Sequence, residues 1–524
     1  MKRILALLIV IGVFIGIFIT LRAKFSELDS EVISEVVTEN EVYVDSLNLP
    51  LIEVDSLNPL LTQNKQVSDI LKLVYEPLFD FDEKNRIEAK LASAWSEKDG
   101  LTWIIKLNDK ASWHSSKDLL ADDIIFTYNA IKKSANSVYK ENIKNILSIE
   151  KLEEKAIQIN LSTEDKFLMY KLTFPIIPKY YFEGDLENEI KNINMVGTGP
   201  YKMENSSDEN PVITLTANTN WWKQEEFKLN KIYLYKYATY GEAIKAFKST
   251  EIDVIATSMS SWQKKFGAIG INNYMYPSSE FETIIPNIQN TLLSESSVRR
   301  MILSGINTEN IIESIYAGNG IVSSCPIPSN SYLNNNNEYK NYDIEKAKQL
   351  LINAGWENSS GVWQKEINGK KYTLKFELLA NSDNEKKVES ADLIAENLKE
   401  IGIEIKIVKV NTNEYNKRIA NGKFELILAT LNLDTDIDLL ELIYSDSEKN
   451  YAKYTNDAIN KIILEMNKDN LQNKIMDLQV QYKNEAPYIG MYYKGNNLLT
   501  NKSVKGNINP TSWNVYHDIT GWCK

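Results

Sequence analysis

The hexapeptide Val196-Gly-Thr-Gly-Pro-Tyr201 is the most informative stretch of this chain. Its two glycines permit the backbone torsions of a tight turn, and its proline fixes the backbone where the turn ends. The tyrosine can then pack beneath the turn. We therefore interpret the hexapeptide as a structural junction, and the nearby pair Trp221-Trp222 as buried packing rather than as a pocket wall. The diagnostic value of the hexapeptide comes from the segments around it.

Characteristic segments flank the hexapeptide in a fixed order. From the N-terminal side, they are residues 91–95, 98–100, 103–107, 113–114, 218–222, 249–254, 298–300 and 342–356. In this order and at these separations, the segments resemble the extracellular solute-binding proteins of family 5. That family comprises the oligopeptide and dipeptide receptors of peptide-importing ABC transporters. The resemblance runs from roughly residue 52 to residue 505, nearly the whole chain beyond its N-terminus.

The resemblance implies an α/β fold of the large periplasmic-binding-protein class (type II). Such a fold has two lobes joined by crossing strands, an additional domain on the N-terminal side, and a cleft that closes on the ligand. Transferred to this chain, it predicts a first lobe, an additional domain and a second lobe. Their residues are 42–60, 181–277 and 491–524 for the first lobe, 61–180 for the additional domain, and 278–490 for the second lobe.

Local patterns support an α/β fold independently of the resemblance. Residues 372–379 and 403–410 have the composition of strands, and residues 385–401 have that of a helix, so together they predict a βαβ unit. Asp343 is a natural N-cap for another helix, which Gly355 would end. Strands mixed with helices along the chain indicate α/β lobes.

The composition is that of a folded and acidic protein. The 524 residues are 43% hydrophobic and 25% charged, with a formal net charge of −12. A chain of this length exceeds what a single core supports, so two or three lobes are expected. Nucleic acids and anionic membrane surfaces are bound by clustered Lys and Arg, so the negative charge argues against both as partners.

An apolar run from Ile4 to Leu21 follows Lys2 and Arg3. Eighteen helical residues rise about 27 Å, close to the roughly 30 Å hydrocarbon core of a bilayer and longer than a usual signal-peptide core. We therefore prefer an uncleaved membrane anchor in residues 1–24, with a cleaved signal segment and secretion as the alternative. The acidic residues 25–41 then form a stalk. The protein is expected at the cell membrane, facing outward.

No motif in the sequence predicts catalysis. The two histidines, His114 and His517, have no evident catalytic partner, and no Gly-x-Ser-x-Gly, His-Glu-x-x-His or phosphate-loop pattern occurs. We therefore expect neither an enzyme nor a cofactor. A bare metal site is also not expected, because the chain has too few His and Cys residues to serve as ligands. The sequence leaves open whether Cys325 and Cys523 form a disulfide.

Asp434 is the sharpest candidate for a ligand-binding residue. In the resembling receptors, a carboxylate pairs with the α-ammonium group of the peptide, and counting from Phe424 places Asp434 at the corresponding position. A buried ammonium needs such a partner to offset its desolvation. The chain departs from the family pattern at Leu431, where a tryptophan is usual, and at Leu428, where some oligopeptide binders have arginine. The alternative interpretation is a loop or helix-cap acid.

Together, these observations predict a monomeric, non-catalytic receptor that captures short peptides and delivers them to the permease subunits of an ABC importer. Tyr139, within Ser137-Val-Tyr139, resembles a cleft tyrosine of oligopeptide receptors and is the second candidate ligand residue. Two alternatives remain open. One is a receptor for an oligosaccharide or another small solute on the same fold, and the other is a sensor or structural membrane protein that does not transport.

Overall fold

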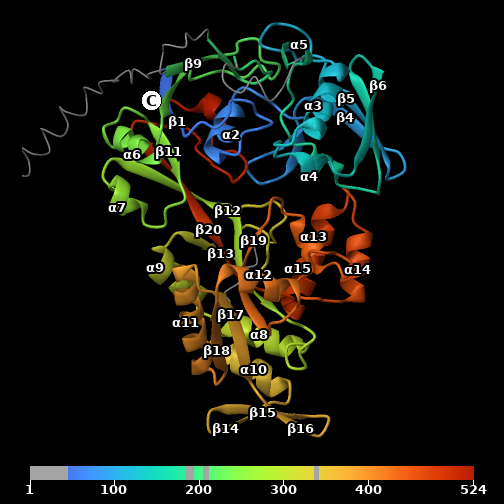
Figure 1. Ribbon diagram of the computed structural model, residues 1–524, viewed down its shortest axis with the longest axis vertical. Coiled ribbons are helices and arrows are strands. Elements are labelled where there is room, and N and C mark those ends of the chain that lie inside the picture. The colour runs from blue at the N-terminus through green and yellow to red at the C-terminus, as the bar shows by residue number, and fades with distance from the viewer. Residues whose placement is uncertain (1–44, 183–193, 205–211, 336–341) are drawn as a thin grey trace, which may run out of the picture. The chain divides into compact units, whose positions relative to one another are not determined.

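The computed structural model describes residues 45–182, 194–204, 212–335 and 342–524 (Figure 1). Residues 45–524 group into one compact unit. Within the described ranges the strands form five sheets, and helices are interspersed along the chain. The predicted membrane segment 1–24 and stalk 25–41 lie outside the described residues. Inside them, none of the helices has the length and apolar character needed to cross a bilayer.

The largest sheet has seven strands and is built on two long antiparallel strands, β12 (Ile271–Pro286) and β20 (Ile489–Asn501). Its order is β11-β20-β12-β19-β17-β18, and β13 also pairs with β20. The shorter strands are β11 (Val254–Thr257), β13 (Gly320–Val322), β17 (Lys375–Asn381), β18 (Glu404–Val410) and β19 (Leu426–Asn432). β11 is therefore an edge strand of this sheet.

The predicted βαβ unit is present as β17, α11 (Glu385–Glu400) and β18, with the two strands paired in parallel. The first strand starts later than predicted, because the short strand β16 (Lys370–Thr373) precedes it and pairs elsewhere. Asp343 caps α10 (Ile344–Asn353), since its carboxylate accepts a hydrogen bond of 2.9 Å from the Lys346 amide. Gly355 follows that helix with a φ of 80°, as its predicted role requires.

A four-stranded sheet of order β1-β10-β9-β8 contains β1 (Ser46–Ile52), β8 (Tyr201–Met203), β9 (Val212–Ala217) and β10 (Lys231–Tyr237). β1 and β10 pair in parallel, with Ile52 opposite Tyr237. Parallel strands end at the same edge of a sheet. The chain segments that leave β1 and β10 therefore lie close together. These segments lead to α2 (Lys65–Leu71) and α6 (Tyr240–Lys248), which flank the site described below.

The remaining elements form smaller units. A second four-stranded sheet of order β4-β5-β7-β6 contains β4 (Ala92–Glu97), β5 (Thr102–Leu107), β6 (Ile146–Glu153) and β7 (Ala156–Leu161). β2 (Phe79–Phe81) pairs with β3 (Ile87–Ala89), and β14 (Glu357–Ser359), β15 (Val362–Ile367) and β16 form a three-stranded sheet. The other helices are α3 (Ala121–Lys133), α4 (Lys140–Ile143), η1 (Leu168–Lys171), α5 (Lys179–Phe182), α7 (Trp262–Phe266), α8 (Ser296–Gly305), α9 (Thr308–Tyr316), α12 (Thr412–Ala420), α13 (Asp438–Ile443), α14 (Asp457–Leu464), α15 (Leu471–Glu485) and η2 (Ile519–Gly521).

Buried apolar side chains gather in several clusters. One cluster joins residues between 47 and 276 to residues 498–522, and another lies within residues 284–492. Both cysteines are buried and free: Cys325 and Cys523 do not form the disulfide that the sequence left open. The boundaries given above for the two lobes and the additional domain stay a prediction.

The hexapeptide Val196–Tyr201 packs against the chain that follows α2. A Cβ atom on Gly197 would lie 1.8 Å from the Val74 carbonyl oxygen, so only glycine fits there. The Gly199 amide donates to the same carbonyl at 2.8 Å. Tyr201 is fully buried, and its hydroxyl donates to the Leu229 carbonyl at 3.1 Å. The hexapeptide is thus a structural junction, as predicted, and it positions the C-terminal side of α2.

The same junction holds a buried carboxylate. Glu76 accepts hydrogen bonds from the indole N–H groups of Trp221 (3.2 Å) and Trp222 (2.9 Å) and from the Thr198 hydroxyl (2.9 Å). Burial raises the pKa of Glu76, and these three donors and the charge of Lys90 oppose that rise. Trp221 is buried as predicted, although it also lines a small cavity, whereas Trp222 is only half-buried. The indole N–H groups of both residues satisfy an acid that the sequence pattern did not single out.

Candidate functional site

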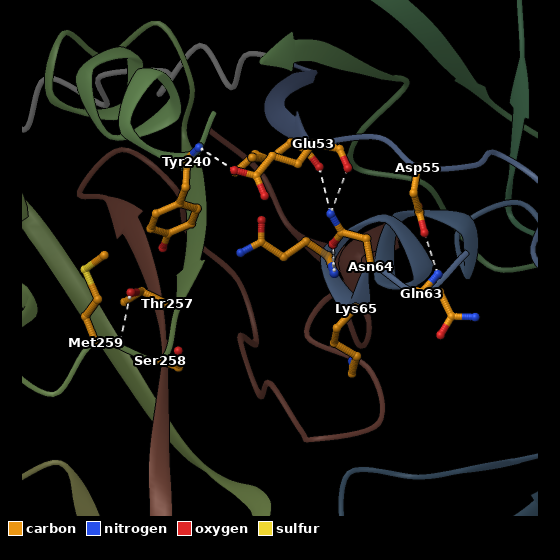
Figure 2. A pocket seen from close by; sticks show the side chains of 11 residues that line it. Glu53, Asp55, Gln63, Asn64, Lys65, Tyr240, Thr257, Ser258 and Met259 are labelled. Atoms are coloured by element: carbon orange, nitrogen blue, oxygen red, sulfur yellow. Dashed lines mark hydrogen bonds between the residues drawn. The ribbon is translucent and has the colours of Figure 1, made fainter. Parts of the chain in front are cut away.

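The candidate site is an open pocket of about 570 Å³ (Figure 2). Four chain segments line it: the end of β1 with the residues that follow, the start of α2 with the residues before it, the first residue of α6, and the end of β11 with the residues that follow. The lining residues are Ile52, Glu53, Asp55, Gln63, Asn64, Lys65, Gln66, Tyr240, Thr257, Ser258 and Met259. A pocket of this size lies within the range of about 300–1,000 Å³ that is usual for small-ligand sites.

Asp55 shapes the loop between β1 and α2. Its carboxylate accepts hydrogen bonds from the Ser56 amide (2.8 Å), the Thr62 hydroxyl (2.6 Å) and the Gln63 amide (2.6 Å). Burial alone would raise the pKa of Asp55, but these hydrogen bonds outweigh it and hold the pKa below its usual value. All three donors come from the loop itself, so Asp55 stabilises the wall of the pocket.

Asn64 joins the first turn of α2 to the end of β1. Its side-chain oxygen accepts from the amides of Gln66 (2.9 Å) and Val67 (3.4 Å), which caps the helix. Its side-chain nitrogen donates to the carbonyls of Ile52 (3.0 Å) and Glu53 (3.1 Å). Figure 2 shows Asn64 between these two segments. One short side chain therefore fixes the helix start against the strand end.

Tyr240 forms the opposite wall. Its hydroxyl donates to the Ala256 carbonyl of β11 at 2.6 Å, and Gln66 donates to the same carbonyl at 3.4 Å. Burial raises the pKa of Tyr240 to about 12, so the phenol stays protonated at neutral pH. Thr257 accepts from the Met259 amide at 3.2 Å and shapes the turn that follows β11.

A lysine of α11 contacts the chain directly after this turn. The Lys386 ammonium donates to the Ser260 hydroxyl at 2.8 Å and lies 4.8 Å from the centre of the Tyr316 ring. Burial and the charge of Lys494 lower the pKa of Lys386. Residues far apart in the sequence are thus joined at the border of the pocket.

Asp434 lies in the loop between β19 and α13, and its side chain is exposed. Among the described residues, no hydrogen bond or ion pair engages its carboxylate, and it does not line the pocket. Asp438, not Asp434, holds the turn before α13 by accepting from the Thr435 amide at 2.9 Å. Asp436 is buried and accepts from the Asn85 side chain at 3.1 Å. Burial raises the pKa of Asp436 to about 7.

Tyr139 lies at the N-terminal side of α4 and lines a different, smaller cavity of about 30 Å³. Its ring is 6.2 Å from that of Phe174. Burial raises its pKa to about 12, although a hydrogen bond with Ser68 opposes this shift. The pocket thus includes neither of the two residues that the sequence put forward, and their roles in ligand binding stay predictions.

None of the residues that line the pocket was predicted from the sequence as a ligand-binding residue. Their one available signal was the segment 249–254, which belongs to the family pattern and leads directly into Thr257 and Met259. The contribution of Glu53 and Tyr240 depends on the parallel pairing of β1 with β10. In the part of the chain that the structure describes, no group of three or more His, Cys, Asp or Glu side chains could hold a metal ion.

Comparison with known proteins identifies the family. The chain matches the family model of the bacterial extracellular solute-binding proteins, family 5 (middle region), over residues 86–453. The oligopeptide-binding protein AppA of Bacillus subtilis (strain 168) is 24% identical over 493 residues, which cover 89% of this chain and 88% of that protein. The nickel-binding periplasmic protein of Escherichia coli (strain K12) is 23% identical over 390 residues, which cover 72% and 73% of the two chains.

A solved structure shows the same fold. The periplasmic murein tripeptide binding protein MppA, in an unliganded open form, has a TM-score of 0.79 at 18% identity. The likeness covers 92% of this chain and 98% of that one, and it confirms the predicted α/β fold of the large periplasmic-binding-protein class. Because the family model extends over well more than half of the 524 residues, the chain belongs to the bacterial extracellular solute-binding proteins of family 5.

Proposed function

We propose that this protein captures short peptides and delivers them to an ABC importer. The observation that carries the proposal is the open pocket at the end of an edge strand, β11, in a chain of this family. Family 5 proteins are extracellular or periplasmic receptors rather than enzymes, and an oligopeptide-binding protein is among the relatives. A nickel-binding protein is also among them, so the family alone does not select the ligand.

Two strand edges support a peptide as the ligand. β11 is the last strand of its sheet and ends at the pocket. β17 pairs with β19 at Leu426 and Ile427, so within the described residues the stretch 428–432 pairs with β12 alone. On these edges the carbonyls of Ala256 and Leu428 already accept from the hydroxyls of Tyr240 and Tyr415. The other main-chain groups of a strand edge can pair with an extended peptide through hydrogen bonds, which hold peptides of varied sequence. A sugar has no main chain that could continue the hydrogen-bond ladder of a strand edge.

Asp434 is proposed as the acceptor of the α-ammonium group of the peptide, and Tyr139 as a further contact. The Asp434 carboxylate follows the free edge of β19 and is not occupied by a protein donor among the described residues. A carboxylate next to a strand edge can neutralise the N-terminus of a peptide that pairs with that edge. The N-terminal run from Ile4 to Leu21 is proposed to tether the receptor outside the cell, beside the permease subunits of its importer.

Isothermal titration calorimetry with the full-length protein tests this function. The ligands are a random tri- to pentapeptide pool and a panel of oligosaccharides. We expect heat from peptides and none from sugars. Heat from the sugars alone would replace the peptide with a carbohydrate, and the absence of binding to either would favour a sensor or structural membrane protein.

A further inference from the structure

The charges around the pocket are unevenly distributed. Glu53, Asp55 and Lys65 line it, and Asp69 lies one helical turn from Lys65. The Lys65 ammonium forms an ion pair with the buried carboxylate of Asp69. The single lysine of the lining is therefore already paired, whereas the two lining carboxylates lack a cationic partner among the described residues. Asp55 directs its oxygen atoms to the loop, which leaves Glu53 as the group that can bind a ligand.

The backbone holds Glu53 at the rim of the pocket. Its φ is 48°, in the left-handed region that non-glycine residues rarely adopt. Its amide donates to the Tyr237 carbonyl at 2.9 Å. One carboxylate oxygen accepts from the Tyr240 amide at 3.3 Å, and the other has no hydrogen-bond partner among the described residues. Figure 2 shows the Glu53 and Tyr240 side chains next to each other.

The surroundings of Glu53 suit an organic cation on an apolar stem. Tyr240 is half-buried, and the bond from its hydroxyl to Ala256 fixes the ring in the wall of the pocket. An aromatic face attracts a nearby ammonium or guanidinium group, and a carboxylate beside it adds direct charge pairing. Met259 and Ile52 provide apolar lining for the methylene groups of a long basic side chain.

We infer that this pocket recognises a cationic group of the peptide through Glu53 and Tyr240. The inference rests on the proposed function and specifies which peptides the site prefers. The cation is the ammonium or guanidinium of a basic side chain, or the α-ammonium of the peptide, in which case Glu53 takes the place proposed above for Asp434. Both present the same charge to Glu53, and chemical modification of the peptide separates them.

Calorimetry with defined peptides tests the inference. The probes are tetra-alanine, its three variants with a single lysine at the second, third or fourth position, their Nε-acetyl-lysine counterparts, and N-acetylated tetra-alanine. Each is titrated into the full-length protein, into Glu53→Gln and into Glu226→Gln. Glutamine can still accept from the Tyr240 amide, so Glu53→Gln changes the charge and keeps the contact. Glu226 is an exposed acid outside the pocket, so its variant is the matched charge control.

For wild type, we expect at least one free-lysine peptide to bind about fivefold more tightly than its acetylated counterpart, since partly exposed charge pairs and cation–π contacts have effects of this order. This ratio should approach one in Glu53→Gln, stay near fivefold in Glu226→Gln, and shrink as salt is added. If N-terminal acetylation is the change that no longer weakens binding to Glu53→Gln, the cation is the α-ammonium, and Asp434 is not its partner.

Two outcomes overturn the inference. If peptides bind but the effect of neither acetylation on affinity depends on Glu53, the pocket does not bind a cation through Glu53. The proposed peptide function then stands. If none of the peptides binds wild type, the proposed function fails, and this inference fails because it rests on that function.

Discussion

His114 is a neutral imidazole fixed by the glycine turn. Its Nδ1 atom accepts from the Gly197 amide at 3.2 Å, so the proton sits on Nε2, which donates to the Gly199 carbonyl at 3.0 Å. Burial lowers its pKa to about 4, from 6.5 in an unfolded chain. Between pH 6.5 and 4 the unfolded state therefore binds a proton at this histidine, whereas the folded state does not. The contribution of His114 to stability is complete above pH 6.5 and is lost as the pH falls.

We expect this linkage to lower the free energy of unfolding by about 2 kcal/mol between pH 7 and pH 5. Urea unfolding of wild type and His114→Gln at both pH values checks it, because the variant should lack this part of the pH dependence. His517→Gln is the matched control. Burial would lower its pKa, but the hydrogen bond and charge of Asp518 outweigh burial and raise it. The contribution of His517 is thus present at low pH and lost as the pH rises, so an equal loss of slope in both variants would contradict this account.

The pairing proposed for the Asp434 carboxylate can be tested by removing its charge. If this carboxylate pairs with the α-ammonium of a bound peptide, Asp434→Asn keeps the size of the side chain and removes the charge. Asp434 is exposed without ligand, so the pair is buried only if the cleft closes over the peptide. Loss of one partner of such a buried pair costs about 2–5 kcal/mol, or roughly 30-fold or more in affinity. N-acetylation of the peptide should weaken binding to wild type by a similar factor and affect the variant much less, because both changes remove one interaction.

Titration of free and N-acetylated peptides into wild type and Asp434→Asn completes this cycle. Equal affinity of wild type for both peptides would return Asp434 to the alternative interpretation, an exposed loop acid. Its replacement would then change the free energy of unfolding by about a few tenths of a kcal/mol, as is usual for a surface substitution.

Among the elements, the two long strands of the large sheet meet in a buried charge network. Glu282 of β12 is almost fully buried and forms an ion pair with Lys387 of α11. It also accepts from the Thr430 hydroxyl of β19 at 2.6 Å, and the ammonium nitrogen of Lys494 in β20 lies 3.4 Å from its Oε1 atom. Burial would raise the pKa of Glu282, but the two lysines outweigh it and lower the pKa. The network therefore joins three strands to one helix.

Removing one partner leaves an unpaired charge in this network. We expect Lys387→Met to reduce the free energy of unfolding by about 3 kcal/mol and Glu282→Gln to cost a comparable amount. The double variant should cost clearly less than the sum, because it leaves no orphaned partner of the pair. Urea denaturation of the four proteins measures the coupling, and strictly additive effects would show that the pair contributes nothing beyond its separate side chains.

Predictability from sequence differs between elements for a physical reason. The β17-α11-β18 unit and the capped helix after Asp343 follow from local periodicity and capping. The pocket does not, because it requires β1 to pair with β10 across more than 180 residues and β11 to pair with β20. Asp434 was found through its spacing within the family pattern. Glu53 was not, because its importance comes from the neighbour that tertiary pairing gives it, Tyr240.

At the scale of the whole molecule, the proposed function depends on where the receptor is held. A tethered receptor stays close to its importer, and confinement raises the effective concentration at which the two meet. A secreted receptor would lose bound peptide to the medium. The apolar run from Ile4 to Leu21 is long enough for an uncleaved anchor, and the acidic residues 25–41 would give the folded part some distance from the bilayer.

The tether can be tested by fractionation of the cells. Protein purified from its native cells should begin near Met1, sediment with membranes, and dissolve in detergent but not in high salt. Ile11→Asp places a charge at the centre of the run, where it costs about 3 kcal/mol in insertion, and should shift the protein toward the soluble fraction. Ser30→Asp, in the stalk, adds the same charge outside the run and should leave the partition unchanged. Intact-mass analysis with a mature N-terminus near Lys24, together with protein in the medium, would show a cleaved signal. Delivery to an importer would then require recapture of a diffusing receptor.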